Sequence, residues 1–533
     1  MRVLCVLALL AACGDDGAAT GGPPLAFGTM GPLSGPAGKG GFRFGAASAA
    51  TQIEDGNTAT DWYLWTKPAA MGGLEKGTFV GDAVRGYSNA TEDVGLAAGL
   101  GLDSYRFSIE WARIEPVKDQ IDEAAIAHYL AQLETMRALG IRPLVTVHHF
   151  SNPVWVADPR GLACSAGPTD TNLCGFGSAG GPQIVEQLRE HAALLGRRFG
   201  GYVDEWGTVN EPINYLLAAY ALAVFPPGGF TLDPLRFAAV LRDYIAAHVA
   251  IYDALKANDT IDADGDGIAA SVGMSLSVAD WQPARDNRAS TDPEDLAAVD
   301  RVVYLYHYVF VDSLLAGMYD ANLDGTRDEP HPEWDDKLDW LGVQYYFRAG
   351  VSGKNPIIPA PIAVTPCTSG VDSGACLPAL QPSYCIPAMG YEGWVDGLHD
   401  VLLAFSQRYP GLPLVVTEHG IATELGTRRA ETIVRGLEAV ARARDEGVDV
   451  RGYYHWSLTD NFEWAEGFVP RFGLYRVDYG SYARTPNDGT ELFGTIADTR
   501  SVTSAQRGRY GGTGPMTREP DHNLDQMCRK APR

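Results

Sequence analysis

Basic residues are scarce in this 533-residue chain. Lysine and arginine total 42 against 66 aspartate and glutamate residues, which gives a formal net charge of −24. Nucleic acids and anionic membranes attract basic surfaces, so this balance argues against both as partners. A neutral partner such as a sugar is compatible with it. Hydrophobic residues make up 46 % and charged residues 20 %, which is typical of a globular protein and not of a disordered one.

The N-terminal apolar run, residues 3–10, is too short to cross a bilayer as a helix. It follows Arg2 and leads into Leu10-Ala-Ala-Cys13, which resembles a bacterial lipoprotein signal peptide whose cysteine, Cys13, is lipidated and becomes the first mature residue. The alternative is a plain secretory signal that is cleaved nearby. Both interpretations predict export. The first predicts a lipid-anchored protein of the cell envelope that contacts the membrane only through its N-terminal lipid.

Cysteine is sparse as well, and its spacing excludes a zinc site because no histidine lies beside any cysteine pair. In an oxidising compartment the cysteines after the signal favour disulfides. We predict that Cys164 pairs with Cys174, since both lie in one Gly/Pro-rich loop, and that Cys528 ties down the C-terminal tail. The cysteines outside the signal are Cys164, Cys174, Cys367, Cys376, Cys385 and Cys528.

Short apolar runs alternate with longer amphipathic stretches along most of the chain. Helical spacing is clear in residues 123–140, 183–200 and 427–447, where apolar residues recur every three or four positions. Eight strands that alternate with helices predict a parallel α/β sheet closed into a (β/α)8 TIM barrel, a single domain with long loops on its catalytic face. The expected strands are residues 42–50, 104–111, 142–149, 205–211, 268–278, 339–346, 413–418 and 451–458.

The chain is thereby divided into four segments, and no internal repeat is present. Residues 1–13 form the signal peptide with its lipobox cysteine, and residues 14–40, rich in Gly, Ala and Pro, are expected to be a flexible tether. Residues 41–495 form the barrel. Residues 496–533 are expected to be a polar C-terminal tail.

Two glutamates stand at the ends of expected strands. Glu211 lies in Thr208-Val-Asn-Glu-Pro212 and Glu418 in Thr417-Glu-His-Gly420. Active sites of barrels lie at the carboxyl ends of the strands, so both side chains are expected at one face. Two carboxylates are what a glycosidase needs, one to protonate the leaving oxygen and one to attack the sugar or activate water.

The motifs along residues 42–486 resemble those of family 1 glycoside hydrolases, the retaining β-glucosidase family, and occur in the same order. Thr208-Val-Asn-Glu-Pro212 resembles the motif of the acid/base and Thr417-Glu-His-Gly420 that of the nucleophile. The resemblance implies that Asn210 contacts the sugar 2-hydroxyl and that Arg106, in Tyr105-Arg-Phe-Ser108, binds the nucleophile. Tyr346 is expected to bind it as well. No cofactor is implied for catalysis.

The same resemblance implies a set of sugar-binding residues. The strand near residue 455 and the loop after it, Trp456-Ser-Leu-Thr-Asp-Asn-Phe-Glu-Trp464, are close to the family's eighth-strand signature. Trp456 is expected to stack under the sugar, and Glu463 and Trp464 to bind its 4- and 6-hydroxyls. The other implied sugar contacts are Gln52, His149 and Phe472.

The chemistry sets requirements for the two glutamates. A retaining enzyme needs carboxyl groups about 5 Å apart. Glu211 must hold a proton when substrate arrives, so we expect the negative charge of Glu418 to raise its pKa. Glu418 must stay ionised, which a cation and a phenol, Arg106 and Tyr346, can secure by hydrogen bonding.

Three positions depart from the family's usual pattern. Gln344 stands where asparagine is usual, and the expectation is that its longer amide still reaches the site. His419 replaces the usual asparagine after the nucleophile and is expected to alter local hydrogen bonds or the response to pH. Tyr391 stands at an aglycone-side tryptophan position, which predicts a different leaving-group preference.

Two acidic loops follow the start of a calcium-binding loop, Asp-x-[Asp/Asn]-x-Asp-Gly, but neither has glutamate at the twelfth position. They predict structural calcium or, as the alternative, two acidic surface turns. The candidate ligands are Asp262, Asp264 and Asp266 in one loop and Asp320, Asn322 and Asp324 in the other.

Taken together, the sequence predicts an exported, exo-acting β-glycosidase that hydrolyses terminal β-D-glucosyl or related β-glycosyl residues by a retaining double displacement. The alternatives are a transglycosylase that uses the same site and a non-catalytic sugar-binding lipoprotein of the cell surface. Binding alone needs neither Glu211 nor Glu418, which argues against the second alternative. The sequence predicts neither the preferred sugar nor the oligomeric state.

Overall fold

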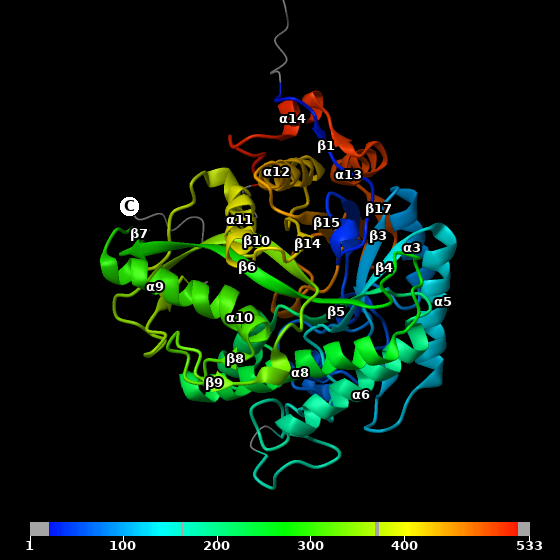
Figure 1. Ribbon diagram of the computed structural model, residues 1–533, viewed down its shortest axis with the longest axis vertical. Coiled ribbons are helices and arrows are strands. Elements are labelled where there is room, and N and C mark those ends of the chain that lie inside the picture. The colour runs from blue at the N-terminus through cyan, green and yellow to red at the C-terminus, as the bar shows by residue number, and fades with distance from the viewer. Residues whose placement is uncertain (1–20, 162–163, 368–372, 521–533) are drawn as a thin grey trace, which may run out of the picture.

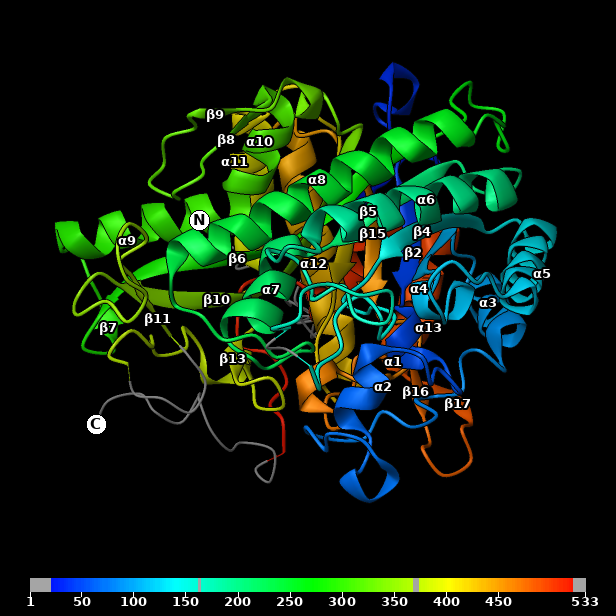
Figure 2. The ribbon, with the colours of Figure 1, turned by 90° about the horizontal axis from the view of Figure 1, so that it is seen from below.

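The computed structural model describes residues 21–161, 164–367 and 373–520. Eight parallel strands follow one another around a closed barrel, and β15 pairs with β2 to complete it. Helices surround the strands (Figures 1 and 2). The predicted (β/α)8 TIM barrel is confirmed. Its strands are β2 (Arg43–Ala47), β3 (Ser104–Ser108), β4 (Arg142–His148), β5 (Glu205–Asn210), β6 (Ser271–Arg285), β10 (Trp340–Ser352), β14 (Leu414–His419) and β15 (Val450–Trp456).

Local sequence explains where the outer helices begin and end. Asp122 accepts hydrogen bonds from two backbone amides at the start of α5 (Glu123–Leu139), and Gly140 ends that helix in the left-handed conformation, with φ 74°. Asp233 caps α8 (Pro234–Asn258) in the same way, with proline in its first turn. The helices α6 (Gly181–Phe199) and α12 (Gly426–Asp445) match two further predicted helices.

Strands β6 and β10 run well past the barrel, which the sequence did not predict. They pair in parallel from Trp340↔Gly273 to Val351↔Pro283 and carry the short strands β11 (Thr365–Pro366) and β13 (Tyr391–Glu392) on β10. The disulfide Cys367–Cys376 lies beside this extension, and the predicted disulfide Cys164–Cys174 is confirmed. Cys13 and Cys528 lie outside the described residues.

The expectation of a flexible tether over residues 14–40 is wrong for its described part, residues 21–40. The strand β1 (Leu25–Ala26) pairs antiparallel with β18 (Ser501–Val502), and Leu33 is fully buried. Buried arginines bind the backbone of this segment, since Arg43 donates to the carbonyl of Gly31 and Arg451 to that of Leu33. Backbone carbonyls can anchor a segment with few large side chains, so composition alone could not reveal it.

The C-terminal boundary also needs correction. Residue 495 falls inside α13 (Asp488–Thr499), and α14 (Ser504–Tyr510) follows β18. Both helices lie beside β1 and α12 in Figure 1. Met516 is buried, and Thr517 donates to Glu431 of α12 at 2.8 Å. Residues 496–520 are therefore packed against the barrel and are not a free tail.

Candidate active site

A cavity of about 240 Å³ lies at the carboxyl ends of the barrel strands. The segments α1 (Ala50–Ile53), α2 (Asp61–Thr66), β16 (Tyr475–Val477) and β17 (Arg484–Pro486) gather at this end of the barrel in Figure 2. Of the residues predicted to bind or cleave substrate, all but Arg106 line the cavity. The predicted residues that line the cavity are Gln52, His149, Asn210, Glu211, Tyr346, Glu418, Trp456, Glu463, Trp464 and Phe472.

Glu418, near the end of β14, accepts hydrogen bonds from three side chains, one on β3 and two on the neighbouring strand β10. Arg106 Nη1 and Gln344 Nε2 donate to its Oε1 at 2.5 and 2.6 Å, and the Tyr346 hydroxyl donates to Oε2 at 2.7 Å. Burial raises the pKa of Glu418 above its usual value, while the charge of Arg106 and the hydrogen bond from Tyr346 oppose that rise. Both carboxylate oxygens are thus held by donors that favour the ionised form.

Gln344 reaches the site, as expected for the longer amide. Its Nε2 donates to Glu418 and also to Asn210 Oδ1, at 2.9 Å. The β10–β14 register shifts just before Gln344, and the β10–β6 register shifts at Tyr346. Such irregularities re-aim side chains near active sites. Here the irregularities lie at Gln344 and Tyr346 of β10, whose side chains both contact Glu418.

Glu211 directly follows β5 and has a different environment. Its backbone is left-handed, with φ 39° and ψ 60°, and Pro212 then starts α7 (Pro212–Leu216). Its Oε2 accepts one hydrogen bond from Asn214 Nδ2, at 2.7 Å. Burial and the nearby charge of Glu418 raise the pKa of Glu211 to about 8. At neutral pH Glu211 therefore holds a proton.

Asn210 shares two hydrogen-bond donors with Glu418. Its Oδ1 accepts from Arg106 Nη2 at 2.5 Å and from Gln344 Nε2 at 2.9 Å. These two donors fix the orientation of the Asn210 amide, and the residue lines the cavity. Arg106 is buried behind the cavity wall and binds Glu418 and Asn210 at once.

The sugar-binding candidates form the inner wall. Gln52 Nε2 donates to the Phe462 carbonyl at 2.9 Å and to Glu463 Oε2 at 3.3 Å. The His149 ring lies 6.1 Å from the rings of both Trp456 and Trp464. Within the described part of the chain, Gln52 Oε1 and His149 Nδ1 have no hydrogen-bond partner. Sugar hydroxyls can supply such partners, and aromatic rings can cover the apolar faces of a sugar.

Two titratable groups of this wall are held neutral. Burial and the charge of Glu418 raise the pKa of Glu463 to about 8. Burial and the charge of Arg106 lower the pKa of His149 well below its usual value. A wall that carries a protonated carboxyl group and a neutral imidazole suits an uncharged ligand.

The outer part of the cavity is more apolar. Tyr391 lines it, as predicted, and its ring lies 5.2 Å from that of Phe347. Sequence reasoning missed several other lining residues, because they lie on helices, strands and loops outside the recognised motifs: Asn214, Phe225, Ser277, Tyr306, Phe347 and Met389.

His419 points away from the cavity. Its Nδ1 lies 2.8 Å from the Tyr453 hydroxyl, and it packs beneath Gly436 of α12. Burial lowers the pKa of His419 to about 3, so the ring stays neutral over the ordinary working range. The expected influence of this residue on the pH response therefore has no support in its surroundings.

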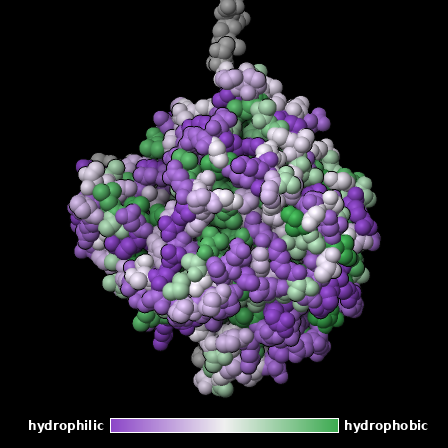
Figure 3. Space-filling view, viewed as in Figure 1, coloured by the Kyte–Doolittle hydropathy of each residue, from purple (hydrophilic) through white to green (hydrophobic). Residues whose placement is uncertain are grey.

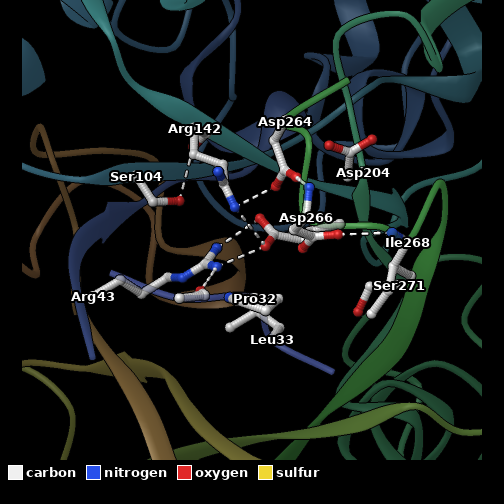
Figure 4. A network of polar contacts seen from close by, with 12 residues as sticks. Pro32, Leu33, Arg43, Ser104, Arg142, Asp204, Asp264, Asp266, Ile268 and Ser271 are labelled. Atoms are coloured by element: carbon white, nitrogen blue, oxygen red, sulfur yellow. Dashed lines mark hydrogen bonds and ion pairs between the residues drawn. The ribbon is translucent and has the colours of Figure 1, made fainter. Parts of the chain in front are cut away.

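The first acidic loop lies at the opposite end of the barrel, between α8 and β6. Figure 4 shows Arg43 and Arg142 pointing toward the carboxylates around Asp264. Ligand oxygens of Asp204, Asp262 and Asp264 lie within 4.8 Å of one another, and Arg142 forms an ion pair with Asp264. Asp204 was not predicted, because it joins the loop only through the fold.

The second acidic loop folds as a hydrogen-bonded turn. Asp320 accepts from the backbone amides of Asp324 and Gly325 at 3.2 and 2.7 Å. Among residues 21–161, 164–367 and 373–520, this loop is not part of a cluster of three metal-ligand side chains. Both loops lie outside the cavity lining. Structural calcium stays a prediction.

Comparisons with known proteins agree with this geometry. A family model described as "Glycosyl hydrolase family 1" matches residues 38–502. The chain is 30% identical to a β-galactosidase of Pyrococcus woesei, over 87% of this chain and 97% of that protein. It is also 30% identical to a bifunctional β-D-glucosidase/β-D-fucosidase of Bifidobacterium breve, over 85% and 96% of the two chains.

Solved structures give the same result. A β-glycosidase from Pyrococcus horikoshii superimposes with a TM-score of 0.73 at 27% identity, covering 91% of this chain and 100% of that one. The family match spans most of the barrel and both glutamate motifs. The chain therefore belongs to glycosyl hydrolase family 1.

Proposed function

We propose that Glu211 and Glu418 divide the work of a retaining β-glycosidase between acid/base and nucleophile. The observation that carries this proposal is the contrast between two carboxyl groups in one cavity. Glu418 accepts hydrogen bonds from three donors, which favour its ionised form and oppose the rise in pKa that burial causes, whereas Glu211 accepts one from Asn214 and has a pKa raised to about 8. Family 1 glycosidases hydrolyse β-glycosidic bonds without a cofactor, which fits a site built from carboxyl groups, a cation and neutral donors.

In the first step a Glu418 oxygen bonds to the anomeric carbon, the bond from that carbon to the leaving oxygen breaks, and Glu211 gives its proton to the leaving oxygen. Glu418 then carries a neutral ester. Its charge no longer raises the pKa of Glu211, so Glu211 can accept a proton from water in the second step. The water oxygen bonds to the anomeric carbon as the bond to Glu418 breaks.

The proposed substrate is an unphosphorylated terminal β-glucosyl, β-galactosyl or β-fucosyl residue. The relatives include a β-galactosidase and a bifunctional β-D-glucosidase/β-D-fucosidase, and the sugars in these names differ at the 4- and 6-positions. Glu463 and Trp464 are the proposed contacts for those positions. A panel of chromogenic β-glycosides, ranked by kcat/KM, tests the order of preference.

The retaining mechanism is tested by proton NMR during the hydrolysis of an aryl β-glucoside. The first sugar product should be the β-anomer, followed by slow mutarotation. An α-anomer formed first would contradict the proposed double displacement, because a single displacement inverts the anomeric carbon.

A transglycosylase on the same site is the second candidate. The aromatic residues Phe347 and Tyr391 at the outer part of the cavity favour it, because they offer an acceptor alcohol an apolar surface. Running the reaction with added alcohol and measuring the ratio of transferred to hydrolysed product separates the two activities.

We propose as well that the protein is exported and anchored by a lipid on Cys13. The support is the sequence motif at residues 10–13 together with disulfides in the part of the chain that the structure describes. No helix within the described ranges is long and apolar enough to cross a membrane. The face seen in Figure 3 is largely hydrophilic, with smaller apolar areas between. A Cys13→Ala variant that still fractionates with membranes would contradict the anchor.

A further inference from the structure

Asn214 contacts Glu211 directly, and neither the motifs nor the family resemblance assigns it a role. It lines the cavity, and its Nδ2 donates to Oε2 of Glu211 at 2.7 Å. Within the described ranges no other hydrogen bond from a side-chain nitrogen to Glu211 is present. The contact joins Asn214 to the group that must give up a proton in one step and take one back in the next.

The backbone around Asn214 is fixed by burial. Its neighbours in α7, Ile213 and Tyr215, are 2% and 0% exposed. The amide of Tyr215 donates to the carbonyl of Glu211 at 2.9 Å, and its hydroxyl accepts from Asn152 at 2.9 Å. One turn of backbone thus ties Asn214 to Glu211, and the surrounding core holds that turn in place.

The chemistry of the donor decides which oxygen of Glu211 can carry the proton. An amide N–H only donates, so it bonds well to a carboxyl oxygen that has no hydrogen of its own. With Oε2 occupied by Asn214, the proton of neutral Glu211 is placed on Oε1. The same oxygen is then the one that is left to accept a proton from water in the second step.

We infer that Asn214 is a positioning residue that fixes the protonated oxygen of Glu211 and, by favouring the carboxylate, keeps Glu211 usable as a base. This inference rests on the proposed acid/base role of Glu211. Its effect is expected on proton transfer and not on binding of the sugar, because the residues that form the sugar-binding wall do not include Asn214.

Several other groups also influence the pKa of Glu211. Glu418 and burial raise its pKa, while Asn214, Arg106 and the Ser277 hydroxyl lower it, and the Tyr306 hydroxyl donates to Ser277 at 3.0 Å. The other titratable side chains that line the cavity are His149, Tyr346, Tyr391, Glu463 and Glu466. Loss of Asn214 should therefore move the pKa of Glu211 upward.

The experiment compares leaving groups in wild type, Asn214→Ala and Asn214→Asp. A phenyl β-glucoside needs protonation of its leaving oxygen, whereas a 2,4-dinitrophenyl β-glucoside does not. In both variants we expect kcat/KM for the phenyl substrate to fall about 10- to 100-fold. For the dinitrophenyl substrate we expect a change below about threefold. The basic limb of the phenyl pH profile should move to higher pH, and further in Asn214→Asp because a second anion then faces Glu211.

Two control variants make the result decisive. Asn89→Leu changes an asparagine outside the cavity and should leave both substrates and the pH profile unchanged. Glu211→Ala should lose phenyl activity and retain dinitrophenyl glycosylation, and if it does not, the proposed function itself fails. If Glu211→Ala behaves as expected but the Asn214 variants lose both substrates equally with an unmoved basic limb, the role of Asn214 is overturned. Turnover of the dinitrophenyl substrate also shows that each variant is folded.

Discussion

Buried glutamates lie at both ends of the barrel, Glu205 at the amino end of β5 and Glu211 and Glu418 at the carboxyl end. The arginine contacts at the two ends differ. At the amino end, Arg43 forms a bidentate ion pair with Glu205, and both of its hydrogen bonds are 2.6 Å long. At the carboxyl end, the buried arginine Arg106 gives only one nitrogen to Glu418 and the other to Asn210. Each end therefore has a buried arginine, and at the carboxyl end the carboxyl groups of Glu211 and Glu418 line a cavity.

A buried arginine–glutamate pair thus stabilises the fold at the amino end, as Arg43–Glu205, and forms part of the proposed active site at the carboxyl end, as Arg106–Glu418. Arg43 also binds the carbonyl of Gly31, so its pair with Glu205 fastens residues 21–40 across the amino end of the barrel. Burial disfavours the charge of Arg43, but Glu205 and Tyr454 together outweigh it and raise the pKa of Arg43. Glu418, by contrast, shares its donors with Asn210 and faces Glu211 across the cavity.

Removing the arginine at the carboxyl end should produce the largest effect on activity. Arg106→Met takes away the only cation that contacts Glu418 within the described ranges and leaves Asn210 with one donor fewer. We expect kcat/KM for an aryl β-glucoside to fall by about 10³-fold or more. Steady-state kinetics on folded protein checks this, and a loss below tenfold would mean that Arg106 does not hold the nucleophile.

Removing the arginine at the amino end should instead reduce stability. Arg43→Met leaves Glu205 buried with only Arg142, whose nitrogen is 3.6 Å away, and we expect a loss of about 3 kcal/mol. Thermal unfolding followed by circular dichroism measures it. The kcat of the protein that stays folded should match wild type. A variant with unchanged stability and reduced kcat would contradict the claim that Arg43 contributes to stability and not to catalysis.

The pH profile gives a smaller and graded test of the carboxyl end. Because Glu211 must be protonated in the first step and its pKa is raised to about 8, kcat/KM should fall as pH rises through about 8. Activity should also fall on the acidic side once Glu418 gains a proton. A basic limb near the ordinary pKa of a glutamate would show that Glu211 is not held in its protonated form.

Much of this arrangement could be predicted from the sequence, because it depends on local patterns. The eight strands and the disulfide Cys164–Cys174 were predicted from apolar runs and from a shared loop, whereas the sugar-binding residues were implied by the resemblance to family 1. Gln344 was expected to reach the nucleophile, and it does so at 2.6 Å.

The parts that could not be predicted depend on contacts between distant segments. Residues 21–40 looked like a linker because they are rich in Gly, Ala and Pro. The contact that Arg451 makes with the carbonyl of Leu33 exists only once the chain has folded. Asp204 joins Asp262 and Asp264 only once β5 and the acidic loop lie side by side. Asn214 has no motif, and its importance is visible only in its contact with Glu211.

The most direct test of the central claim is to identify the carboxylate that bonds to the sugar. A 2-deoxy-2-fluoro β-glucoside with a dinitrophenolate leaving group slows the second step and lets the glycosyl-enzyme accumulate. Mass spectrometry of the digested protein should then find the fluoro-sugar on the peptide that contains Glu418. A label on Glu211, or inactivation without any covalent label, would contradict the proposed division of roles.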